Sequence, residues 1–402
     1  MTRLFFASAA AISLASAACA QPAGVEPPPN VPEFRPAFEG QTRAPRLDSG
    51  VELEAARLAG PLEHPWGIAL TPDGTILVTE RPGRLRVIRD GVLVPEPVAG
   101  LPKVLAQKQG GLLDVTVGPE FATDRMIYWT YSKPLPGGVS ATAAARGRLS
   151  EDMTQVTGVE DILVQDPPAP EPMHYGSRIL FDGEGLAHVT LGERSTPKNR
   201  VLAQDLGATY GKVVRITAEG EAPRDNPFVG REGALPTILS YGHRNIQGAA
   251  FRPGTGQLWT IEHGPKGGDE LNLIEPGANY GWPVISYGIN YNGSPVGKKI
   301  TAAEGMEQPV YYWDPVIAPG GMVFYEGGMF PDWEGDLIVA ALSPGAVVRL
   351  EMEGDRVVGE ERLLSDQGRI RDVAIAPDGA ILAITDARGG ALLRLTPKAA
   401  EG

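Results

Sequence analysis

One pattern occurs six times along this sequence: a short apolar run, a tight turn rich in proline, aspartate and glycine, and a second apolar run. The copies span residues 66–81, 113–132, 177–194, 247–264, 321–343 and 371–387. Their turns lie about 46 to 78 residues apart, which leaves room for one four-stranded sheet with variable loops in each copy. The repeat predicts an all-β fold, namely a six-bladed β-propeller of four-stranded antiparallel blades.

The composition agrees with a chain of many short strands. The 402 residues include 51 glycines and 37 prolines, which indicates frequent turns and argues against a helical bundle. The apolar runs hold five to seven residues and are rich in β-branched and aromatic types, as buried strands are. A β-sandwich or two unrelated β domains remain the alternative to a propeller.

The net charge and the hydropathy of the chain limit its partners. With 36 basic and 49 acidic residues the formal charge is −13, so a broad nucleic-acid-binding surface is not expected. Beyond the N-terminus, the sequence has no run of about 20 apolar residues, so no transmembrane segment is expected.

The first 20 residues have the pattern of a Sec signal peptide. Arg3 precedes an apolar run, and Ala18-Cys19-Ala20 is a small-x-small site that predicts cleavage before Gln21. A lipoprotein signal at Cys19 is the alternative. Residues 21–50 are rich in proline and predict an extended linker rather than packed structure, so the propeller is assigned to residues 51–398. We therefore expect a periplasmic or secreted protein.

Polar residues gather at one end of the repeated strand pairs. In a hairpin, the start of the first strand and the end of the second lie at the same end of the sheet. A ring of such ends around a propeller axis predicts a funnel for an anionic or polyhydroxylated ligand. The residues at these ends are His64, Glu80, Arg81, Gln109, Ser132, Lys133, His174, Glu193, Arg194, Arg244, Asn245, Glu262, His263, Arg369, Thr385 and Asp386.

Among the five histidines, His174 is the candidate base because it stands directly before a repeat strand. Glu193, at the end of the next strand, is placed to accept the second ring N–H of that histidine. His188 falls within a strand and is expected to be a structural residue. The sequence contains no HExxH or GxSxG motif and no dinucleotide-binding fingerprint, which argues against a zinc hydrolase, a serine hydrolase and a nicotinamide enzyme.

The segment EHGPKGGDELN, residues 262–272, combines glycines with acidic side chains. Glycines leave backbone carbonyls free to face a ligand, and Asp269 and Glu270 add hard oxygen donors. Oxygen donors of this kind suit Ca²⁺ rather than a transition metal. A solvent-exposed acidic turn is the alternative interpretation.

Four longer motifs, GHRNIQGAAF, EHGPKGGDELN followed by NYGWP, WDPVIAPGGMVFY and GRIRDVAIAPDG, occur in this order. Together they resemble the soluble quinoprotein glucose and aldose sugar dehydrogenases over nearly all of the chain after its N-terminal segment. The resemblance implies a six-bladed propeller with pyrroloquinoline quinone (PQQ) and Ca²⁺ in its funnel.

The resemblance also implies roles for individual residues. His174 would be the base at the sugar C1 hydroxyl, with Glu193 supporting it, and Arg244 would stabilise charge on the reduced quinone. The implied cofactor contacts are Gln109, Arg244, Asn245, His263, Asp269, Arg369, Arg371 and Thr385. The implied metal ligands are the carbonyls of Gly264 and Pro265 at one Ca²⁺, with Glu270 and Tyr280 around a second.

Two positions depart from the glucose dehydrogenase branch of that family. Ser343 stands where that branch has a lysine, and His263 replaces a glutamine. Both departures favour the broader aldose dehydrogenase branch.

The sequence therefore predicts an exported PQQ- and Ca²⁺-dependent oxidoreductase that converts aldoses to lactones. Because the chain has no CxxCH haem motif, its electrons are expected to pass to a separate cytochrome or quinone. Two alternatives are a Ca²⁺-dependent propeller lactonase and a non-catalytic propeller that binds a sugar or a protein.

Overall fold

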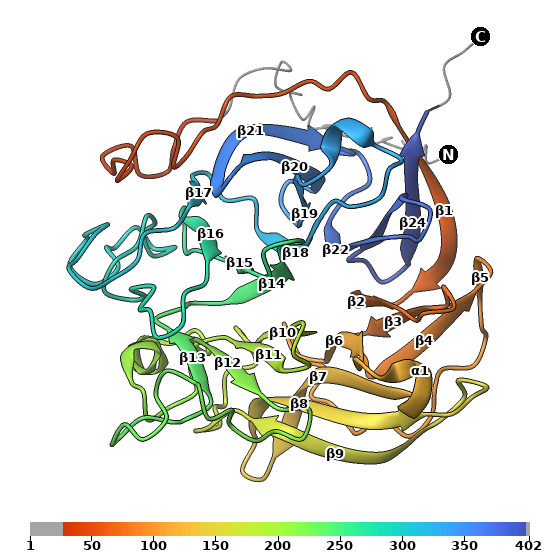
Figure 1. Cartoon of the computed structure of the whole chain (residues 1–402). Coiled ribbons are helices and arrows are strands. Elements are labelled where there is room, and N and C mark those ends of the chain that lie inside the picture. The colour runs from red at the N-terminus through yellow and green to blue at the C-terminus, as the bar shows by residue number, and fades with distance from the viewer. Residues whose placement is uncertain (1–26, 399–402) are drawn as a thin grey trace, which may run out of the picture.

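The computed structural model describes residues 27–398. Twenty-four strands form six separate four-stranded sheets in this part of the chain, and every neighbouring pair of strands is antiparallel. The sheets surround one axis, and the strands nearest the centre are β2, β6, β10, β14, β18 and β22 (Figure 1). The prediction of a six-bladed propeller is confirmed, and the sandwich alternative is excluded. The expected signal peptide and Cys19 lie outside the described residues.

The first three blades follow one another along the chain. Blade 1 contains β2 (Pro65–Leu70), β3 (Ile76–Glu80), β4 (Arg84–Arg89) and β5 (Val92–Leu93). Blade 2 contains β6 (Leu112–Val117), β7 (Met126–Leu135), β8 (Val139–Leu149) and β9 (Val156–Val164). Blade 3 contains β10 (Gly176–Phe181), β11 (Ala187–Leu191), β12 (Lys212–Ile216) and β13 (Ile238–Tyr241).

The remaining three blades complete the ring. Blade 4 contains β14 (Ile246–Phe251), β15 (Leu258–Glu262), β16 (Asp269–Leu273) and β17 (Tyr311–Trp313). Blade 5 contains β18 (Pro319–Phe324), β19 (Leu337–Ala341), β20 (Ala346–Glu353) and β21 (Arg356–Leu363). Blade 6 contains β22 (Ile370–Ile375), β23 (Ile381–Thr385), β24 (Gly390–Pro397) and the N-terminal strand β1 (Leu53–Leu62).

The ring is closed where strands from the two ends of the chain pair in one blade. β1 pairs with β24, so the N-terminal strand is the outer strand of the C-terminal blade. Hydrogen bonds between the first and last strands of the propeller therefore join blade 6 to the N-terminal part of the chain and close the ring of blades.

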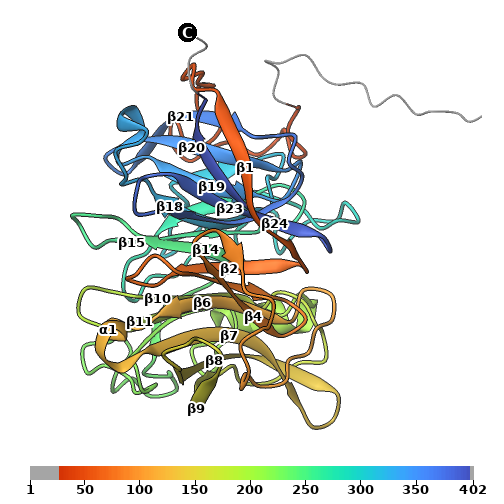
Figure 2. The ribbon, with the colours of Figure 1, turned by 90° about the vertical axis from the view of Figure 1, so that its right-hand side faces the viewer.

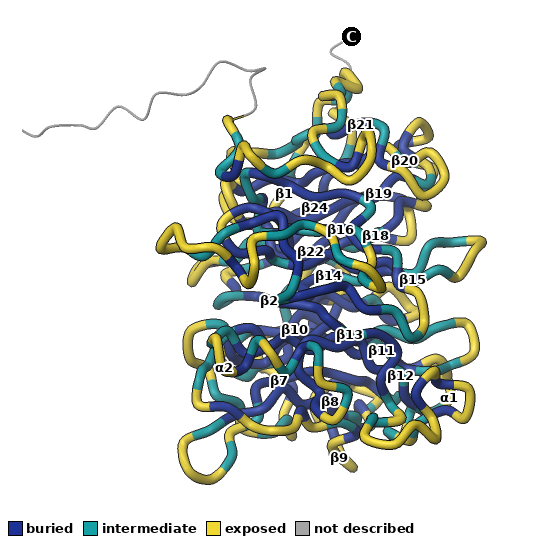
Figure 3. The backbone as a smooth tube through the Cα atoms, turned by 90° about the vertical axis from the view of Figure 1, so that its left-hand side faces the viewer, coloured by how far each residue is buried: buried dark blue, intermediate teal, exposed yellow. Residues whose placement is uncertain are grey.

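The six sequence repeats correspond to the two innermost strands of each blade. The second strands, such as β3 and β11, are buried along their whole length. Their apolar side chains pack between neighbouring blades, which is why they appear as continuous apolar runs rather than as an alternating pattern. A quarter-turn view places β14, β2, β10 and β6 in the middle of the molecule (Figure 2), and these inner strands are mostly buried while the connecting loops are exposed (Figure 3).

Helical structure is limited to short connections in residues 27–398. These are α1 (Phe121–Asp124), α2 (Pro197–Arg200) and two 3₁₀ turns, η1 (Val201–Gln204) and η2 (Pro331–Trp333). Within the described residues, no helix has the length and apolar character needed to cross a membrane.

Residues 27–50, part of the expected linker, form an extended segment along the outer edges of blades 4 and 5 (Figure 1). Val31 and Gln41 in this segment are buried. Backbone hydrogen bonds join Gln41 to β17 and Leu47 to β21. The described part of the segment is thus extended, as its prolines suggest, but it is packed against the propeller instead of lying free of it.

Three charged residues meet on the axis below the funnel. Arg178 on β10 forms ion pairs of 3.0 Å with Asp114 on β6 and with Asp372 on β22. Glycines at the equivalent positions of other blades make room for this hub: a Cβ on Gly67 would lie 2.7 Å from Asp114 Oδ1, and one on Gly321 would overlap Asp372. The hub separates the funnel above it from a second cavity of about 180 Å³ below.

Candidate active site in the axial funnel

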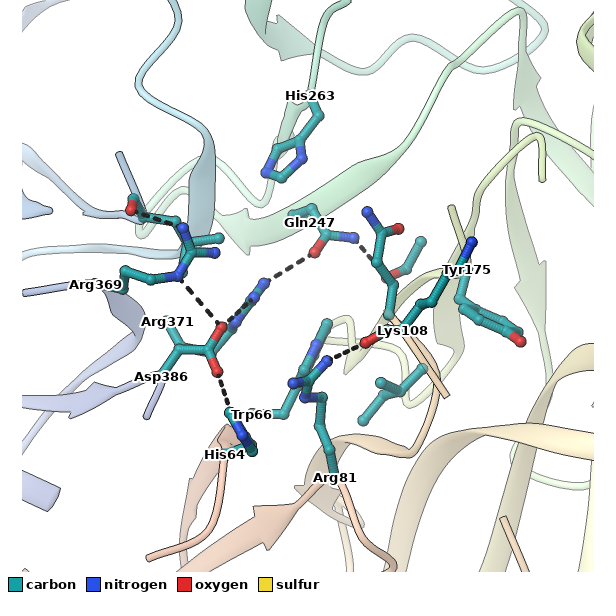
Figure 4. Close-up of a pocket in the computed structure, with 14 residues that line it drawn as sticks. His64, Trp66, Arg81, Lys108, Tyr175, Gln247, His263, Arg369, Arg371 and Asp386 are labelled. Atoms are coloured by element: carbon teal, nitrogen blue, oxygen red, sulfur yellow. Dashed lines mark hydrogen bonds and ion pairs between the residues drawn. The ribbon is translucent and has the colours of Figure 1, made fainter. Parts of the chain in front are cut away.

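The funnel contains a cavity of about 370 Å³, which is within the range of about 300–1,000 Å³ that small-ligand sites occupy. Its lining residues come from strand ends and loops of several blades, and their side chains face one space (Figure 4). Those that the sequence placed at the ring are His64, Arg81, Gln109, His263, Arg369 and Asp386, and Arg371 joins them. For these residues the expected convergence on one axis is observed, whereas His174, Glu193, Arg244 and Asn245 are not among the residues that line the cavity.

One wall of the cavity is a cluster around Asp386. Its carboxylate lies 2.9 Å from Arg371 Nη2, 3.7 Å from Arg369 Nε and 3.1 Å from His64 Nδ1. Burial alone would raise the pKa of Asp386, but the charge of Arg371 holds that pKa well below its usual range. Asp386 is therefore ionised, and it orients the two arginines at the cavity wall.

Several buried donors near the cavity lack a hydrogen-bond partner in the described structure. These are Arg371 Nε, Arg244 Nε and the amide nitrogen of Asn245. A buried polar group without a partner costs about 1–3 kcal/mol, so groups of this kind indicate a missing partner. A ligand rich in acceptor oxygens, such as a quinone bearing carboxylates, fits this donor set.

His174 lies directly before blade 3 and is held by two contacts. Its backbone N–H donates to Gln109 Oε1 at 2.7 Å, and its Nδ1 lies 2.8 Å from Glu193 Oε1. Its φ of 49° is in the left-handed region, an uncommon backbone for a histidine. A Cβ on Gly192 would overlap the His174 carbonyl, so the strand beside it requires glycine.

The Glu193 contact determines how the imidazole can react. With the carboxylate bound at Nδ1–H, the free Nε2 is the acceptor of the neutral ring. Burial lowers the pKa of His174, and the positive charge of Arg244 lowers it further. The ring is thereby kept neutral and able to take a proton.

Arg194, next to Glu193, is a structural residue of this site. It is fully buried and donates to the carbonyl of Met173 at 3.1 Å and to Ser140 at 2.9 Å, and its guanidinium stacks on Tyr175 at 4.1 Å. It holds the backbone on both sides of His174 in place.

Arg244 and Asn245 are positioned by Glu262. The Glu262 carboxylate accepts the Arg244 N–H at 2.6 Å and lies 3.0 Å from His243 Nδ1. The Arg244 side chain donates to the His263 carbonyl at 2.7 Å and stacks on Trp282 at 5.2 Å.

His263 lies close to both Arg371 and Arg244. Its Nε2 is 2.7 Å from the Pro319 carbonyl. Burial lowers its pKa to about 3, and the charge of Arg371 acts in the same direction. His263 is therefore a neutral polar wall of the cavity.

A second, smaller space of about 10 Å³ adjoins the funnel and is lined by Glu262, Gly264, Pro265 and Glu270. Burial raises the pKa of Glu270 well above its usual value, and the neighbouring Glu262 carboxylate raises it further. Glu270 and the Gly264–Pro265 backbone bring to this space oxygen donors of the kind that suits Ca²⁺, while the Glu262 carboxylate already accepts from Arg244 and contacts His243. Residues 27–398 contain no group of three or more His, Cys, Asp or Glu side chains that would hold a metal without carbonyl ligands.

Three residues expected at the ligand sites make other contacts. Asp269 accepts the N–H groups of Gly264, Ile317 and Ala318 at 2.7–2.9 Å, so its oxygens organise the loop. The Thr385 hydroxyl accepts the Ala391 N–H at 3.0 Å, away from the cavity lining.

Tyr280 is the third of these residues. Its hydroxyl donates to the Leu273 carbonyl at 2.5 Å, and its ring stacks on His243 at 4.6 Å. It lines the small space beside Glu270, but its hydroxyl is engaged with the backbone.

Sequence reasoning did not select Trp66 and Gln247, which form part of the cavity floor. Gln247 Oε1 accepts a hydrogen bond from Arg371 at 3.2 Å. Both residues follow the first paired residue of their inner strand, as Arg371 does. Aligning the six repeats position by position would have found them.

Fold and site together define a propeller enzyme with an arginine-lined axial cavity and a buried histidine–carboxylate pair, His174–Glu193, beside it. The family model for glucose/sorbosone dehydrogenases matches residues 62–394. The chain belongs to this family and is a sugar oxidoreductase, so the resemblance found in the sequence motifs is confirmed.

Individual relatives agree with this membership. Aldose sugar dehydrogenase YliI of Escherichia coli (strain K12) is 43% identical over 344 residues, which is 85% of this chain and 92% of the relative. The apo-form crystal structure of the soluble aldose sugar dehydrogenase from Escherichia coli has a TM-score of 0.82 at 42% identity, covering 86% of this chain and 100% of its own. The PQQ-bound aldose sugar dehydrogenase from Streptomyces coelicolor has a TM-score of 0.70 at 26% identity, covering 87% and 99%.

Proposed function

We propose that this protein is an exported PQQ- and Ca²⁺-dependent aldose dehydrogenase that oxidises sugars at C1 to lactones. The observation that carries the proposal is the His174–Glu193 pair, which lies directly behind the Tyr175 and Gly176 wall of a cavity that also presents Arg369 and Arg371. A base opposite a cluster of cations is the arrangement that hydride transfer from a neutral sugar to an anionic acceptor requires.

The cavity walls suit a flat anionic cofactor. Arg369 and Arg371 would pair with carboxylates, while Arg244 and Asn245 would donate to ring oxygens, since each of the latter two has a buried donor without a partner. When bound, PQQ supplies the acceptor for the hydride that leaves the sugar C1. The PQQ-bound relative from Streptomyces coelicolor supports this choice of cofactor.

The proton of the sugar is handled by the chain itself. His174 Nε2 takes the proton of the C1 hydroxyl, and Glu193 stabilises the imidazolium that forms. The C1–H bond breaks and the hydrogen leaves with both electrons as a hydride. The C1–O bond then becomes the carbonyl of the lactone. His174 then returns its proton to solvent.

The Gly264 and Pro265 carbonyls and the Glu270 carboxylate would hold Ca²⁺, and Tyr280 and Glu262 line the same space. A divalent cation there neutralises the two buried carboxylates and places positive charge beside the cofactor pocket. Asp269 acts on this loop through the backbone, by fixing the Gly264 N–H.

Export and the electron acceptor belong to the same proposal. The signal-peptide pattern of residues 1–20 supports a periplasmic or secreted enzyme. The two electrons per turnover would pass to a separate cytochrome or quinone.

The test is reconstitution of the purified chain with PQQ and CaCl₂, followed by dye reduction with a panel of aldoses. We expect a saturable change in the PQQ absorption spectrum and sugar-dependent dye reduction that disappears with a chelator. Lactone hydrolysis without dye reduction would support a lactonase instead. Absence of both activities, together with absence of a spectral change, would leave only a binding propeller.

A further inference from the structure

The extended segment of residues 30–47, here called the N-terminal brace, crosses blades 4 and 5 beside the candidate metal loop. It precedes the region that the family model matches, residues 62–394. The Escherichia coli apo structure is covered completely by 86% of this chain, so this chain has additional residues beyond the shared propeller. The contacts of the brace with the propeller indicate its role in this chain.

Gln41 is the centre of these contacts and is fully buried. Its Nε2 donates to the Pro309 carbonyl at 2.9 Å, and its Oε1 lies 3.1 Å from the Tyr287 hydroxyl, which also lies 2.6 Å from Gln308 Oε1. Tyr287 is itself buried and stacks on Tyr312 of β17 at 3.9 Å. A side chain of the brace thus reaches the interior face of the loop that follows blade 4's third strand.

Tyr287 and Gly288 form one wall behind the candidate metal loop. A Cβ on Gly268 would lie 3.1 Å from the Tyr287 Cβ, and a Cβ on Gly288 would lie 2.9 Å from the Pro265 ring. Lys266 and Ile289 exchange two backbone hydrogen bonds of 2.8 and 3.1 Å. The backbone that presents the Gly264 and Pro265 carbonyls is therefore packed directly on this wall.

Asp314 and Trp313 form the opposite wall, and the brace holds this wall too. The Asp314 carboxylate accepts the backbone N–H groups of Asn30 at 2.8 Å and Val31 at 2.9 Å. The Trp313 carbonyl accepts the Gly268 N–H at 2.8 Å. Both walls of the loop are thus tied to one extended segment that is more than 240 residues away in sequence.

We propose that the N-terminal brace positions the Gly264–Gly268 loop for metal binding, with Gln41 as the positioning residue acting through Tyr287. The brace replaces solvent at the backs of both walls and limits the movement of the loop carbonyls. Groups that support metal ligands from behind change metal affinity by about 10- to 100-fold when they are removed. The ordering of the loop stands on the contacts above, while its effect on Ca²⁺ rests on the proposed function.

The test compares Gln41→Ala and Tyr287→Phe with the wild-type chain and with Ser49→Ala. Ser49, two residues beyond the brace, contacts Glu361 of blade 5 and no residue of the loop walls, so it is the matched control. Two quantities are measured on the full protein: hydrogen exchange at the Gly264, Lys266 and Gly268 amides without added metal, and Ca²⁺ affinity by calorimetry.

We expect both variants to exchange these three amides faster than the wild type and the control, with unchanged exchange in blades 1 to 3. We also expect about a tenfold loss of Ca²⁺ affinity for Gln41→Ala. Wild-type exchange at the loop in both variants would overturn the proposal, as would faster exchange spread evenly over all six blades. Tyr287→Phe keeps the stacked ring, so it decides the matter if Gln41→Ala unfolds.

The two proposals fail in distinguishable ways. If the wild-type chain binds no Ca²⁺, the metal part of the proposed function is wrong, and the exchange data still decide whether the brace orders the loop. If Ca²⁺ binds equally well to all variants, the positioning role is wrong while the proposed function stands.

Discussion

Three histidines of this protein have Nδ1 within about 3 Å of a carboxylate, yet their surroundings give them different chemistry. The His243–Glu262 pair is fully buried under Tyr280, and it holds backbone in place. The His64–Asp386 pair lies at the cavity mouth with the imidazole about one-third exposed. The Nε2 of His243 is engaged by the Ser240 hydroxyl at 2.9 Å, whereas His174 combines a paired Nδ1 with a pKa lowered by burial and by Arg244, which makes it the candidate base.

Replacing His174 by glutamine tests this assignment. Glutamine keeps a polar side chain but cannot take the proton, so we expect turnover to fall by about 10²- to 10⁴-fold while PQQ still binds. Dye-coupled kinetics and a spectral PQQ titration measure the two effects separately. His188→Gln is the matched control because His188, on β11, pairs with Asp182 in the turn before that strand. Near-normal turnover of His174→Gln would remove the proposed base.

Asp386 should give the protein a stability that depends on pH. Its pKa is lower in the folded chain than the unfolded value of about 3.9, so the unfolded state binds the proton more readily. The stabilisation is therefore present above about pH 4 and is lost as the pH falls towards the folded pKa.

We expect Asp386→Asn to be less stable than the wild type at pH 7 and to lose less stability between pH 5 and pH 3. Urea unfolding across this range measures both. Asp378→Asn is the control, because Asp378 pairs with Arg394 in an exposed ion pair, which contributes little. Equal pH slopes for the wild type and Asp386→Asn would contradict the prediction.

At the scale of strands, the two inner strands of each blade were predictable and the outer strands were less so. The inner pairs are apolar runs around a turn, whereas β5 has two residues and β17 has three. Strands this short carry too few residues to show a period in the sequence. Pairing of β1 with β24 joins residues that are far apart in the chain, and no local signal marks it.

The closing strand offers an element-scale prediction. Leu62 at the end of β1 is buried in the cluster between blades 6 and 1, and Leu62→Ala should destabilise the protein by about 2–5 kcal/mol through the cavity it leaves. Leu58→Ala on the same strand should cost less because Leu58 is only half-buried. The free energy of unfolding in urea is the measurement, and equal losses for the two variants would show that closure does not depend on Leu62.

At the scale of the whole molecule, the axial hub joins blades that the chain visits far apart. Arg178 pairs with Asp114 and Asp372, donates to the Gln247 carbonyl at 2.7 Å, and stacks on Trp66 at 4.4 Å. Five blades therefore meet at one guanidinium beneath the cavity floor. Trp66 and Gln247 are themselves floor residues, so the hub supports the site from below.

Removing the hub cation should be costly. Arg178→Met would leave two buried carboxylates, Asp114 and Asp372, without a cation to balance their charge, and we expect a loss of about 3–5 kcal/mol in the free energy of unfolding. Adding Asp114→Asn and Asp372→Asn to the same chain should recover part of this loss, because the uncompensated charges are then gone. A single variant as stable as the wild type, or a triple variant weaker than the single one, would contradict the electrostatic account.

The sequence by itself determined the repeat, the number of blades and the polar character of the strand ends, because each of these depends on residues close together in the chain. It also placed His174 before the first strand and Glu193 after the second strand of one hairpin, so that both lie at the same end of the sheet. Their 2.8 Å contact is a local consequence of that hairpin. Only the tertiary structure decided that Asp269 serves the backbone, that Arg178 joins five blades, and that Asn30 meets Asp314. Such contacts arise when the ring closes and the blades take their final angles, and the energy that selects them comes from burial shared by distant segments rather than from any local pattern.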